Sequence, residues 1–400
     1  MLKDMSNMLP LEEALAILLE GVEALPAEQV PLRDALGRAL AQDVVSDIDM
    51  PPFNKAAMDG YACRRADLGG ELSVVETIQA GTPPTREVGP GECARIMTGA
   101  AVPAGADCVA MVEQTEEPAP GRMCFTGEGT ADNICPRGED MRVGDAVLRR
   151  GMVVGPQEVA MLASVGCVRV PVTRRARVGI LSTGDELVEP EERPAPGQIR
   201  TSNSAQLCAQ ALRAGAQPTY YGIARDTEAD LGRRLGQALA ENDVVLVSGG
   251  VSMGDFDLVP GIMRAHGLDI RFDAVAMKPG KPTTFGRKPG KYCLGLPGNP
   301  VSSFVQFELL ARPLLAKLAG AAWRPLEVTL PLRREVTRRG LDRALWLPVQ
   351  LKGDGFVTRT FHGSAHVGSV CGADGLVCIP IGVDTVAAGT PMRVRLFGCG

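Results

Sequence analysis

The chain has 400 residues, of which 45% are hydrophobic and 22% charged, and its formal net charge is −5 at pH 7. That length exceeds what one hydrophobic core usually organises, so we expect several domains. The composition excludes a disordered chain. The charges are interspersed and form no basic stripe, which argues against nucleic acid as a partner.

Eleven cysteines occur, and no two of them form a C-x-x-C pair. This spacing disfavours a structural zinc site or a redox dithiol and is typical of reduced thiols in the cytoplasm. Residues 1–10 lack the apolar core of a signal peptide, and no later run of about 18 apolar residues follows. We therefore expect a cytoplasmic protein without membrane-spanning segments.

The first predicted element is an amphipathic helix that starts after Pro10 and ends near Pro26. Its apolar side chains recur at helical spacing. They are Leu11, Leu15, Leu18, Leu19 and Val22. Such a helix has to pack its apolar face on another part of the fold.

Residues 50–145 have a different pattern, because Gly and Pro every few residues separate short apolar runs. This pattern predicts a β-rich module with many turns. A short helix at 157–165 and a strand at 168–172 follow it. The module therefore reads as an insertion into an N-terminal helical, linking domain of residues 1–49 and 146–176.

Residues 177–322 repeat the order of strand, glycine-containing loop and helix. The strands are expected at 178–181, 244–247 and 292–296, and the helices at 204–212, 258–265 and 301–318. Alternation of this kind predicts a parallel sheet covered by helices. Residues 323–400 return to alternating strands and predict a small C-terminal β domain. The expected fold class is therefore multidomain α/β.

Three junctions between strands and helices carry polar residues, and such crevices bind anions in parallel α/β sheets. At the first junction, Gly184 permits a sharp turn before Asp185 and Glu186. A carboxylate there can hold Mg²⁺. The alternative is that Asp185 caps a helix.

At the second junction, Ser248-Gly249-Gly250 follows an apolar strand. Paired glycines let backbone N–H groups approach a phosphate, and the hydroxyls of Ser248 and Ser252 add donors. Asp257 lies just beyond, placed for a metal or for a helix cap. A purely structural glycine turn is the alternative.

The third junction joins Lys278-Pro279-Gly280-Lys281-Pro282 to Leu296-Pro297-Gly298-Asn299-Pro300. Prolines stiffen the backbone around the two lysines, so both can face one anion with little entropy to lose. Ser302 and Ser303 follow as anion ligands or helix caps. The alternative is that the lysines are merely solvated.

Seven motifs in this order make the chain resemble the molybdopterin molybdenumtransferase family, which is related to the C-terminal domain of gephyrin. The motifs are Pro51-Pro52-Phe53 with Ala57-Met58-Asp59-Gly60-Tyr61-Ala62, Arg95-Ile96-Met97-Thr98-Gly99-Ala100, Arg137-Gly138-Glu139-Asp140, and the segments 182–187, 248–257, 278–282 and 296–300. The resemblance covers nearly the whole chain.

The resemblance implies an enzyme that inserts molybdate into adenylylated molybdopterin with Mg²⁺-dependent release of AMP. It also implies an elongated homodimer of four-domain subunits, in which the β-rich module of one subunit lends residues to the α/β crevice of the other. A transient contact with the upstream pterin adenylyltransferase is a further expected interaction.

The resemblance also assigns residues. The implied catalytic residues are Asp59, Thr98 and Asp140 in the module and Glu186, Asp226 and Asp257 in the α/β domain, and the last three are also the implied Mg²⁺ ligands. The implied substrate-binding residues are Ser248, Gly249, Gly250, Ser252, Lys278, Lys281, Pro297, Gly298, Pro300, Ser302, Ser364 and Ser369.

The sequence departs from the family pattern at two places. Asn54-Lys55-Ala56 stands where many relatives carry an acidic residue. Trp346-Leu347-Pro348 stands where relatives often carry an arginine, for which Arg343 is the candidate substitute.

Three other interpretations fit parts of the sequence. A gephyrin-like scaffold would keep the fold without turnover, but would be expected to lose the acidic and lysine loops. A pterin adenylyltransferase would share the α/β unit without needing the two β-rich parts. A tungstate-preferring version of the same enzyme would look alike, because tungstate has nearly the size and charge of molybdate.

Overall fold

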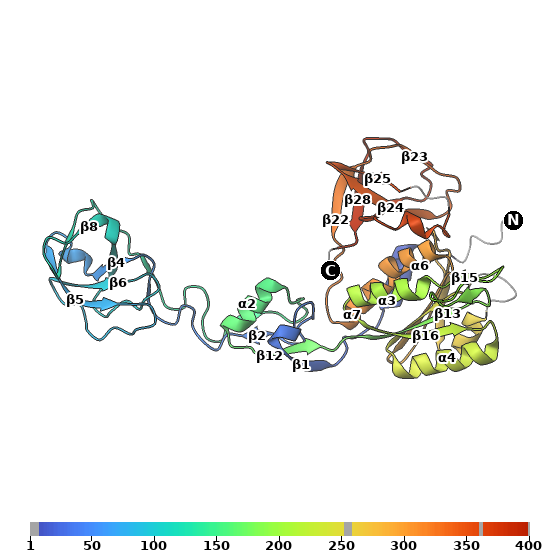
Figure 1. Ribbon diagram of the computed structural model, residues 1–400, viewed down its shortest axis with the longest axis horizontal. Helices are drawn as coiled ribbons and strands as arrows, with labels where there is room; N and C mark the ends of the chain where they lie inside the picture. Colours follow the sequence, from blue (N-terminus) through green and yellow to red (C-terminus); the bar gives the residue numbers. More distant parts are fainter. Residues whose placement is uncertain (1–7, 252–257, 360–362, 399–400) are drawn as a thin grey trace.

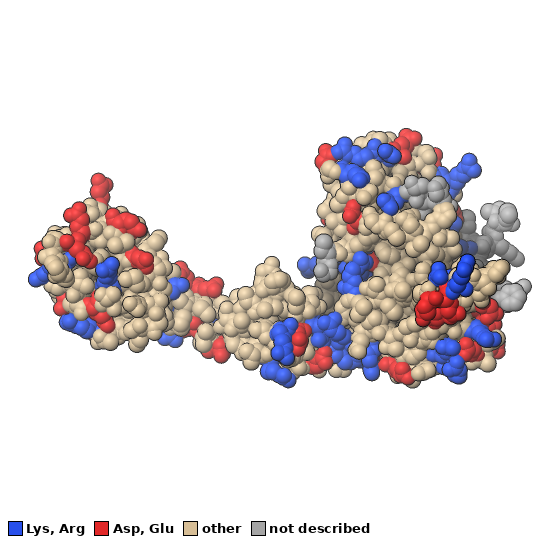
Figure 2. Space-filling model, viewed as in Figure 1, with Lys and Arg blue, Asp and Glu red and all other residues tan. Residues whose placement is uncertain are grey.

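The computed structural model describes residues 8–251, 258–359 and 363–398. In this part of the chain an outlying β-rich module, a small middle domain and a larger α/β body follow one another along the long axis, and a C-terminal β domain lies against the α/β body (Figure 1 and Figure 2). No helix among the described residues is long and apolar enough to cross a bilayer.

The module is built on a six-stranded sheet with the order β7-β4-β6-β5-β9-β8. Its strands are β4 (Gly60–Cys63), β5 (Glu71–Ile78), β6 (Glu92–Ile96), β7 (Cys108–Met111), β8 (Thr115–Glu116) and β9 (Arg122–Phe125). Side chains alternate between two small cores, so that Tyr61 packs on one face of the sheet and Ala62 on the other. A short ladder of β3 (Lys55–Ala56) and β10 (Ile134–Cys135) closes the module.

The middle domain pairs segments from before and after the module. Its elements are β1 (Ala27–Pro31) with β12 (Arg169–Thr173), β2 (Val44–Val45) with β11 (Ala146–Leu148), and helix α2 (Pro156–Ser164). Leu40, Leu162 and Val170 lie at the centre of its core.

A compact joint links the module to the middle domain. Met50 and Met141 form an antiparallel bridge. Arg137 Nε lies 2.7 Å from Asp49 Oδ2, and the backbone N–H of Arg137 donates to Asn54 Oδ1 at 2.9 Å. The departure at Asn54 thus has a structural role here, because its side chain holds the second crossing segment.

The α/β body has a six-stranded sheet with the order β16-β13-β17-β21-β20-β18. The strands β13 (Arg177–Thr183), β16 (Gln217–Ala224), β17 (Val244–Ser248) and β21 (Lys291–Leu296) are parallel. The strands β18 (Asp269–Ala274) and β20 (Pro282–Lys288) run antiparallel at one edge. The sheet is therefore mixed where the repeat predicted only parallel strands, because a tight hairpin, and not a helix, joins β20 to β21.

Helices cover both faces of this sheet. They are α1 (Leu11–Leu19), α3 (Asn203–Arg213), α4 (Glu228–Glu241), α5 (Val259–Ala265), α6 (Pro300–Gln306) and α7 (Arg312–Leu318), with a π-helical turn at Phe307–Ala311 between the last two. In β17, Val244 and Leu246 belong to one core, and Val245 and Val247 belong to the other. The opening helix α1 buries Leu11, Ala14 and Leu18 in the first of these cores.

The C-terminal β domain shares a sheet with the α/β body. Its sheet has the order β19-β24-β26-β28-β22, with β25 paired to β24. The strands are β19 (Met277–Lys278), β22 (Glu327–Pro331), β24 (Ala344–Lys352), β25 (Gly355–Thr358), β26 (Gly375–Ile379) and β28 (Pro391–Leu396). Two short pairs lie outside this sheet: β14 (Leu187–Val188) pairs with β15 (Ile199–Arg200), and β23 (Val336–Thr337) pairs with β27 (Thr385–Val386). Because β19 comes from the lysine segment, this pairing places the C-terminal domain beside the lysines.

Candidate active site

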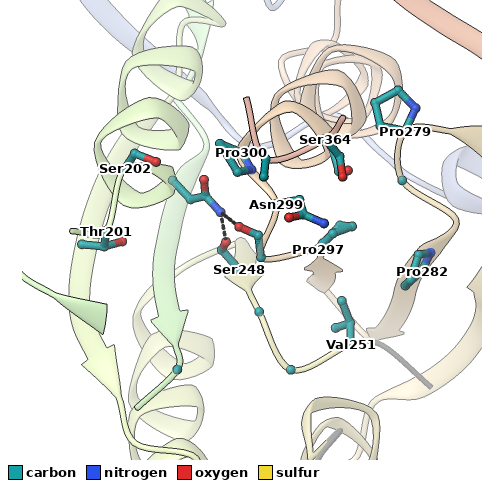
Figure 3. A pocket seen from close by; sticks show the side chains of 18 of the residues that line it. Thr201, Ser202, Ser248, Val251, Pro279, Pro282, Pro297, Asn299, Pro300 and Ser364 are labelled. Atoms are coloured by element: carbon teal, nitrogen blue, oxygen red, sulfur yellow. Dashed lines mark hydrogen bonds between the residues drawn. The ribbon is translucent and has the colours of Figure 1, made fainter. Parts of the chain in front are cut away.

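A pocket of about 770 Å³ lies at the carboxyl ends of the parallel strands. Its walls come from the loops after β13, β17 and β21, from the lysine segment, and from the C-terminal domain (Figure 3). Sequence-predicted residues that line it are Glu186, Asp226, Ser248, Gly249, Gly250, Lys278, Lys281, Pro297, Gly298, Pro300, Ser302 and Ser364. The three predicted junctions thus converge on one cavity, as expected for an α/β crevice.

The acidic side of the pocket is formed by Glu186 and Asp226. The hydroxyl of Thr183 donates to Asp226 Oδ1 at 2.5 Å. The carboxylate of Glu186 folds back over Gly184, where a Cβ would lie 2.5 Å from Glu186 Oε2. Asp185 does not cap a helix, because strand β14 follows it; instead Asp185 Oδ1 accepts a hydrogen bond from the backbone N–H of Asp226.

The Ser-Gly-Gly loop forms the floor of the pocket. Gly249 has a φ of +103°, and a Cβ there would lie 2.4 Å from the backbone oxygen of Thr183. Only glycine fits this approach. Ser252 and Asp257, the other predicted members of this junction, lie outside the described residues.

The opposite wall combines the lysine segment and the start of α6. Ser302 lies in the first turn of α6 and is buried. The backbone N–H of Val301 donates to the backbone oxygen of Ser364, so the C-terminal domain is tied to this helix start.

The described charges around the pocket are unequal. Its basic lining residues are Lys278, Lys281, Arg200 and Arg343, and its acidic ones are Glu186 and Asp226. Four cations against two carboxylates favour a ligand with several negative charges. Among the described residues no cluster of three or more His, Cys, Asp or Glu side chains could hold a metal ion, and the third predicted Mg²⁺ ligand is not among them.

Comparison with known proteins bears on the identity of the whole chain. Residues 9–166 match the family described as MoeA N-terminal region (domain I and II), residues 179–317 the probable molybdopterin binding domain, and residues 329–397 the MoeA C-terminal region (domain IV). A Staphylococcus aureus protein named molybdopterin molybdenumtransferase is 34% identical over 408 residues, which cover 99% of this chain and 97% of the relative. This chain belongs to the MoeA family.

Other MoeA relatives agree. A Staphylococcus epidermidis molybdopterin molybdenumtransferase is 35% identical, with 92% of this chain and 90% of the relative covered. The crystal structure of a molybdopterin biosynthesis MoeA protein from Pyrococcus horikoshii is 31% identical, has a TM-score of 0.87, and is matched over 98% of this chain and 100% of its own.

Three residues that the MoeA resemblance assigns to catalysis lie away from the pocket. Thr98 donates to Asp59 Oδ1 from its backbone N–H at 2.5 Å and from its hydroxyl at 2.8 Å. These bonds lower the pKa of Asp59, the backbone one most strongly. Both residues belong to the outlying module and Asp140 belongs to the joint, so a single chain does not bring them to the pocket (Figure 1).

The C-terminal domain of this MoeA chain brings only one of its two predicted serines to the lining of the pocket. Ser364 lines the pocket, whereas Ser369 is buried outside the lining with a hydroxyl that has no partner among the described residues. Arg343 does line the pocket, while Trp346 and Pro348 lie within strand β24. The candidate substitute for the missing arginine is therefore placed where an anion can reach it.

Sequence reasoning missed several lining residues, among them Arg200 and Asn203. Asn203 starts α3, and its Nδ2 donates to Ser248 Oγ and to the backbone oxygen of Gly298, both at 2.7 Å (the dashed lines at Ser248 in Figure 3). The polar run Thr201-Ser202-Asn203-Ser204 at a helix start was the available signal. Its pairing with loops far along the chain could not be read from it.

Proposed function

We propose that the chain is a molybdopterin molybdenumtransferase, which inserts molybdate into adenylylated molybdopterin and releases AMP. The observation that carries this proposal is the pocket at the strand ends, where four cationic side chains and two carboxylates of the described residues meet a glycine-rich loop. A dianionic oxyanion and a pyrophosphate-linked nucleotide together need such a surplus of positive charge. The relatives over the full length carry the same activity in their names.

We assign the two ends of the pocket to the two substrates. Ser248 and the glycines after it face the phosphates, because a hydroxyl and closely approaching backbone suit phosphate oxygens. Lys278, Lys281 and Ser302 hold molybdate, since two lysines on a proline-stiffened segment lose little entropy when they bind an anion. Arg343 adds a cation on the same side.

The donor set fits Mg²⁺. Glu186 and Asp226 both offer carboxylate oxygens to the pocket, and Mg²⁺ typically takes one or two carboxylates together with substrate phosphates. Bound there, Mg²⁺ would neutralise charge on the pyrophosphate. The role of Asp226 is to hold one fixed carboxylate at the pocket edge, since Thr183 occupies its Oδ1.

A homodimer would complete the site. Asp59, Thr98 and Asp140 would then reach the pocket of the second copy from the outlying module. Exposed apolar side chains on the middle domain, Leu36, Val45, Val153 and Val168, are each at least 50% exposed. A second copy packed against the middle domain would remove this apolar surface from water.

We place the protein in the cytoplasm. The ten described cysteines are all free thiols, and free thiols persist in reducing compartments. There it would meet the upstream pterin adenylyltransferase, and a transient contact between the two proteins would hand over the adenylylated pterin.

The test is release of AMP from adenylylated molybdopterin by the purified protein with Mg²⁺. We expect AMP only when molybdate is present, and an arm with tungstate measures the preference between the two oxyanions. Binding of the pterin without AMP release would overturn the proposed enzymatic activity and would favour a scaffold.

A second experiment tests the shared site. Asp59→Ala and Lys281→Met are each expected to be inactive, but a mixed dimer of the two should regain part of the wild-type rate, because one of its pockets has all its residues. A mixed dimer as inactive as its parents would contradict the shared site.

A further inference from the structure

Gln306 ends helix α6 and is completely buried, outside the pocket lining. Its Nε2 donates to the backbone oxygen of Gly280 at 2.6 Å, to that of Pro282 at 3.1 Å, and to Thr283 Oγ1 at 2.5 Å. The two N–H bonds of one amide are thus shared among three acceptors at the end of the lysine segment, two backbone carbonyls and one hydroxyl.

The two carbonyls that this amide holds lie on either side of Lys281. Gly280 has a φ of +105°, and a Cβ there would lie 2.5 Å from Gln306 Nε2. The segment is thus seated directly on the amide with no room for a side chain between them. These bonds hold the peptide between Gly280 and Lys281 and the peptide between Pro282 and Thr283. The backbone is thereby restrained on both sides of Lys281, and with it the direction in which the Lys281 side chain leaves.

The other end of the same helix belongs to the pocket. Helix α6 begins at Pro300, and Ser302 in its first turn lines the cavity with Lys281. Gln306 therefore connects the helix that carries the Ser302 hydroxyl to the segment that carries the Lys281 ammonium group, and both groups line the same cavity.

The oxygen of the same carboxamide is not used in this way. Gln306 Oε1 is buried and has no hydrogen-bond partner among the described residues. Burying an unpaired polar atom is unfavourable, and an apolar side chain of the same length would avoid that cost. The glutamine is thus explained by the donors that it supplies to the lysine segment.

We propose that Gln306 is a positioning residue for the oxyanion site. It acts by holding Lys281 at a fixed position relative to Ser302. This inference rests on the proposed function, because it assumes that these two groups bind molybdate. It predicts a selective defect. Loss of the amide weakens oxyanion binding and leaves nucleotide binding at the Ser-Gly-Gly loop unchanged.

The test compares two buried glutamines in the full-length protein. Gln306→Met removes the donors at similar volume. Gln210→Met is the matched control, because Gln210 is buried and donates to the backbone oxygen of Phe304 and to Glu308 of the same helical segment. Its Nε2 bonds among the described residues do not include the lysine segment. The dissociation constants of tungstate and of AMP are measured by calorimetry for each variant and for the wild type.

We expect Gln306→Met to bind tungstate about tenfold more weakly, the effect of losing one or two hydrogen bonds, and to bind AMP within about twofold of the wild type. Gln210→Met should bind both within about twofold. Unchanged tungstate binding by Gln306→Met, or equal losses in both variants, would overturn the inference.

A second variant covers the case in which Gln306→Met does not fold. Gln306→Asn keeps the donors but is one methylene shorter, and it is expected to weaken tungstate binding at least threefold without changing AMP binding; an unchanged tungstate constant overturns the inference. If the wild type itself bound no tungstate and no molybdate, the proposed function would fail as well. Wild-type binding with unaffected Gln306 variants would reject the positioning role alone.

Discussion

The hydroxyl of Thr183 donates a 2.5 Å hydrogen bond to Asp226 Oδ1 and so joins the ends of two neighbouring parallel strands. Asp226 follows β16, where it would be an ordinary loop acid without this partner. The bond occupies one carboxylate oxygen and fixes the direction of the other.

Thr183→Val should therefore weaken the response to Mg²⁺. We expect the Mg²⁺ concentration for half-maximal AMP release to rise about tenfold, because groups that orient a metal-binding carboxylate typically change metal affinity by that factor or more. The control is Thr85→Val, whose hydroxyl bonds Glu76 in the module at 2.8 Å. An unchanged Mg²⁺ titration for Thr183→Val would show that this bond does not orient a metal ligand.

Thr98→Val should move the acid limb of the pH profile. The pKa of Asp59 is lowered by the backbone N–H of Thr98 and by its hydroxyl, and the valine removes the second of these. The pKa of Asp59 then rises, so AMP release should decline at a higher pH than in the wild type. Rates measured from about pH 2.5 to about pH 7, which spans the titration of carboxylates, check this. If the pH profiles of Thr98→Val and the wild type coincide, the ionisation of Asp59 does not limit the rate of AMP release.

Asp243→Asn should destabilise the α/β body. Burial opposes ionisation of Asp243, but two bonds from Arg174, at 2.7 and 2.8 Å, and one from the backbone of Arg177 outweigh it and lower its pKa below 3.8. We expect a loss of about 3 kcal/mol at pH 7 by urea unfolding, since breaking a largely buried ion pair leaves a charge without its partner.

The effect of Asp243→Asn on stability should depend on pH. A carboxylate whose folded-state pKa is depressed contributes stability above its unfolded pKa of 3.8 and loses it as pH falls through the folded value. The difference between wild type and Asp243→Asn should be full at pH 7 and shrink below about pH 4. Asp34→Asn, at an exposed pair with Arg33, is the control and should change stability by less than about 0.5 kcal/mol.

Gly249→Ala should disable the phosphate end of the pocket. The new Cβ would lie 2.4 Å from a backbone oxygen, so the loop has to move. Gly290→Ala is the matched control, because Gly290 also has a positive φ, of +69°, but nothing lies within 4 Å of its Cβ position. AMP binding should be lost in the first variant and kept in the second, which pays only about 1 kcal/mol of backbone strain. Retained AMP binding in Gly249→Ala would place the phosphates elsewhere.

Parts of this molecule with a strong local pattern were predictable. The apolar run before Ser248 indicated a buried parallel strand, and the structure places β17 there at the centre of its sheet. The lysine segment and the Pro-Gly-Asn-Pro turn were recognisable because prolines and glycines restrict the backbone in characteristic ways. All three junctions that these signals marked meet in one pocket.

Features that depend on distant pairing were not predictable. Gln306 and Asn203 form hydrogen bonds with loops that are distant in sequence, and the residues around each of them do not indicate those partners. The antiparallel edge of the sheet was missed because strand direction depends on the connection between strands, and a short apolar run carries no direction. The distance of Asp59 from the pocket is likewise a property of the assembled domains.

The joint at Met50 and Met141 gives the outlying module the mechanics of a lever arm. Two crossing segments, pinned by Asn54, Asp49 and Arg137, set the angle at which the whole module leaves the middle domain. A rotation of a few degrees at such a pivot displaces the far end in proportion to the length of the arm. Small packing changes at the joint are therefore amplified into large changes at the far end of the module.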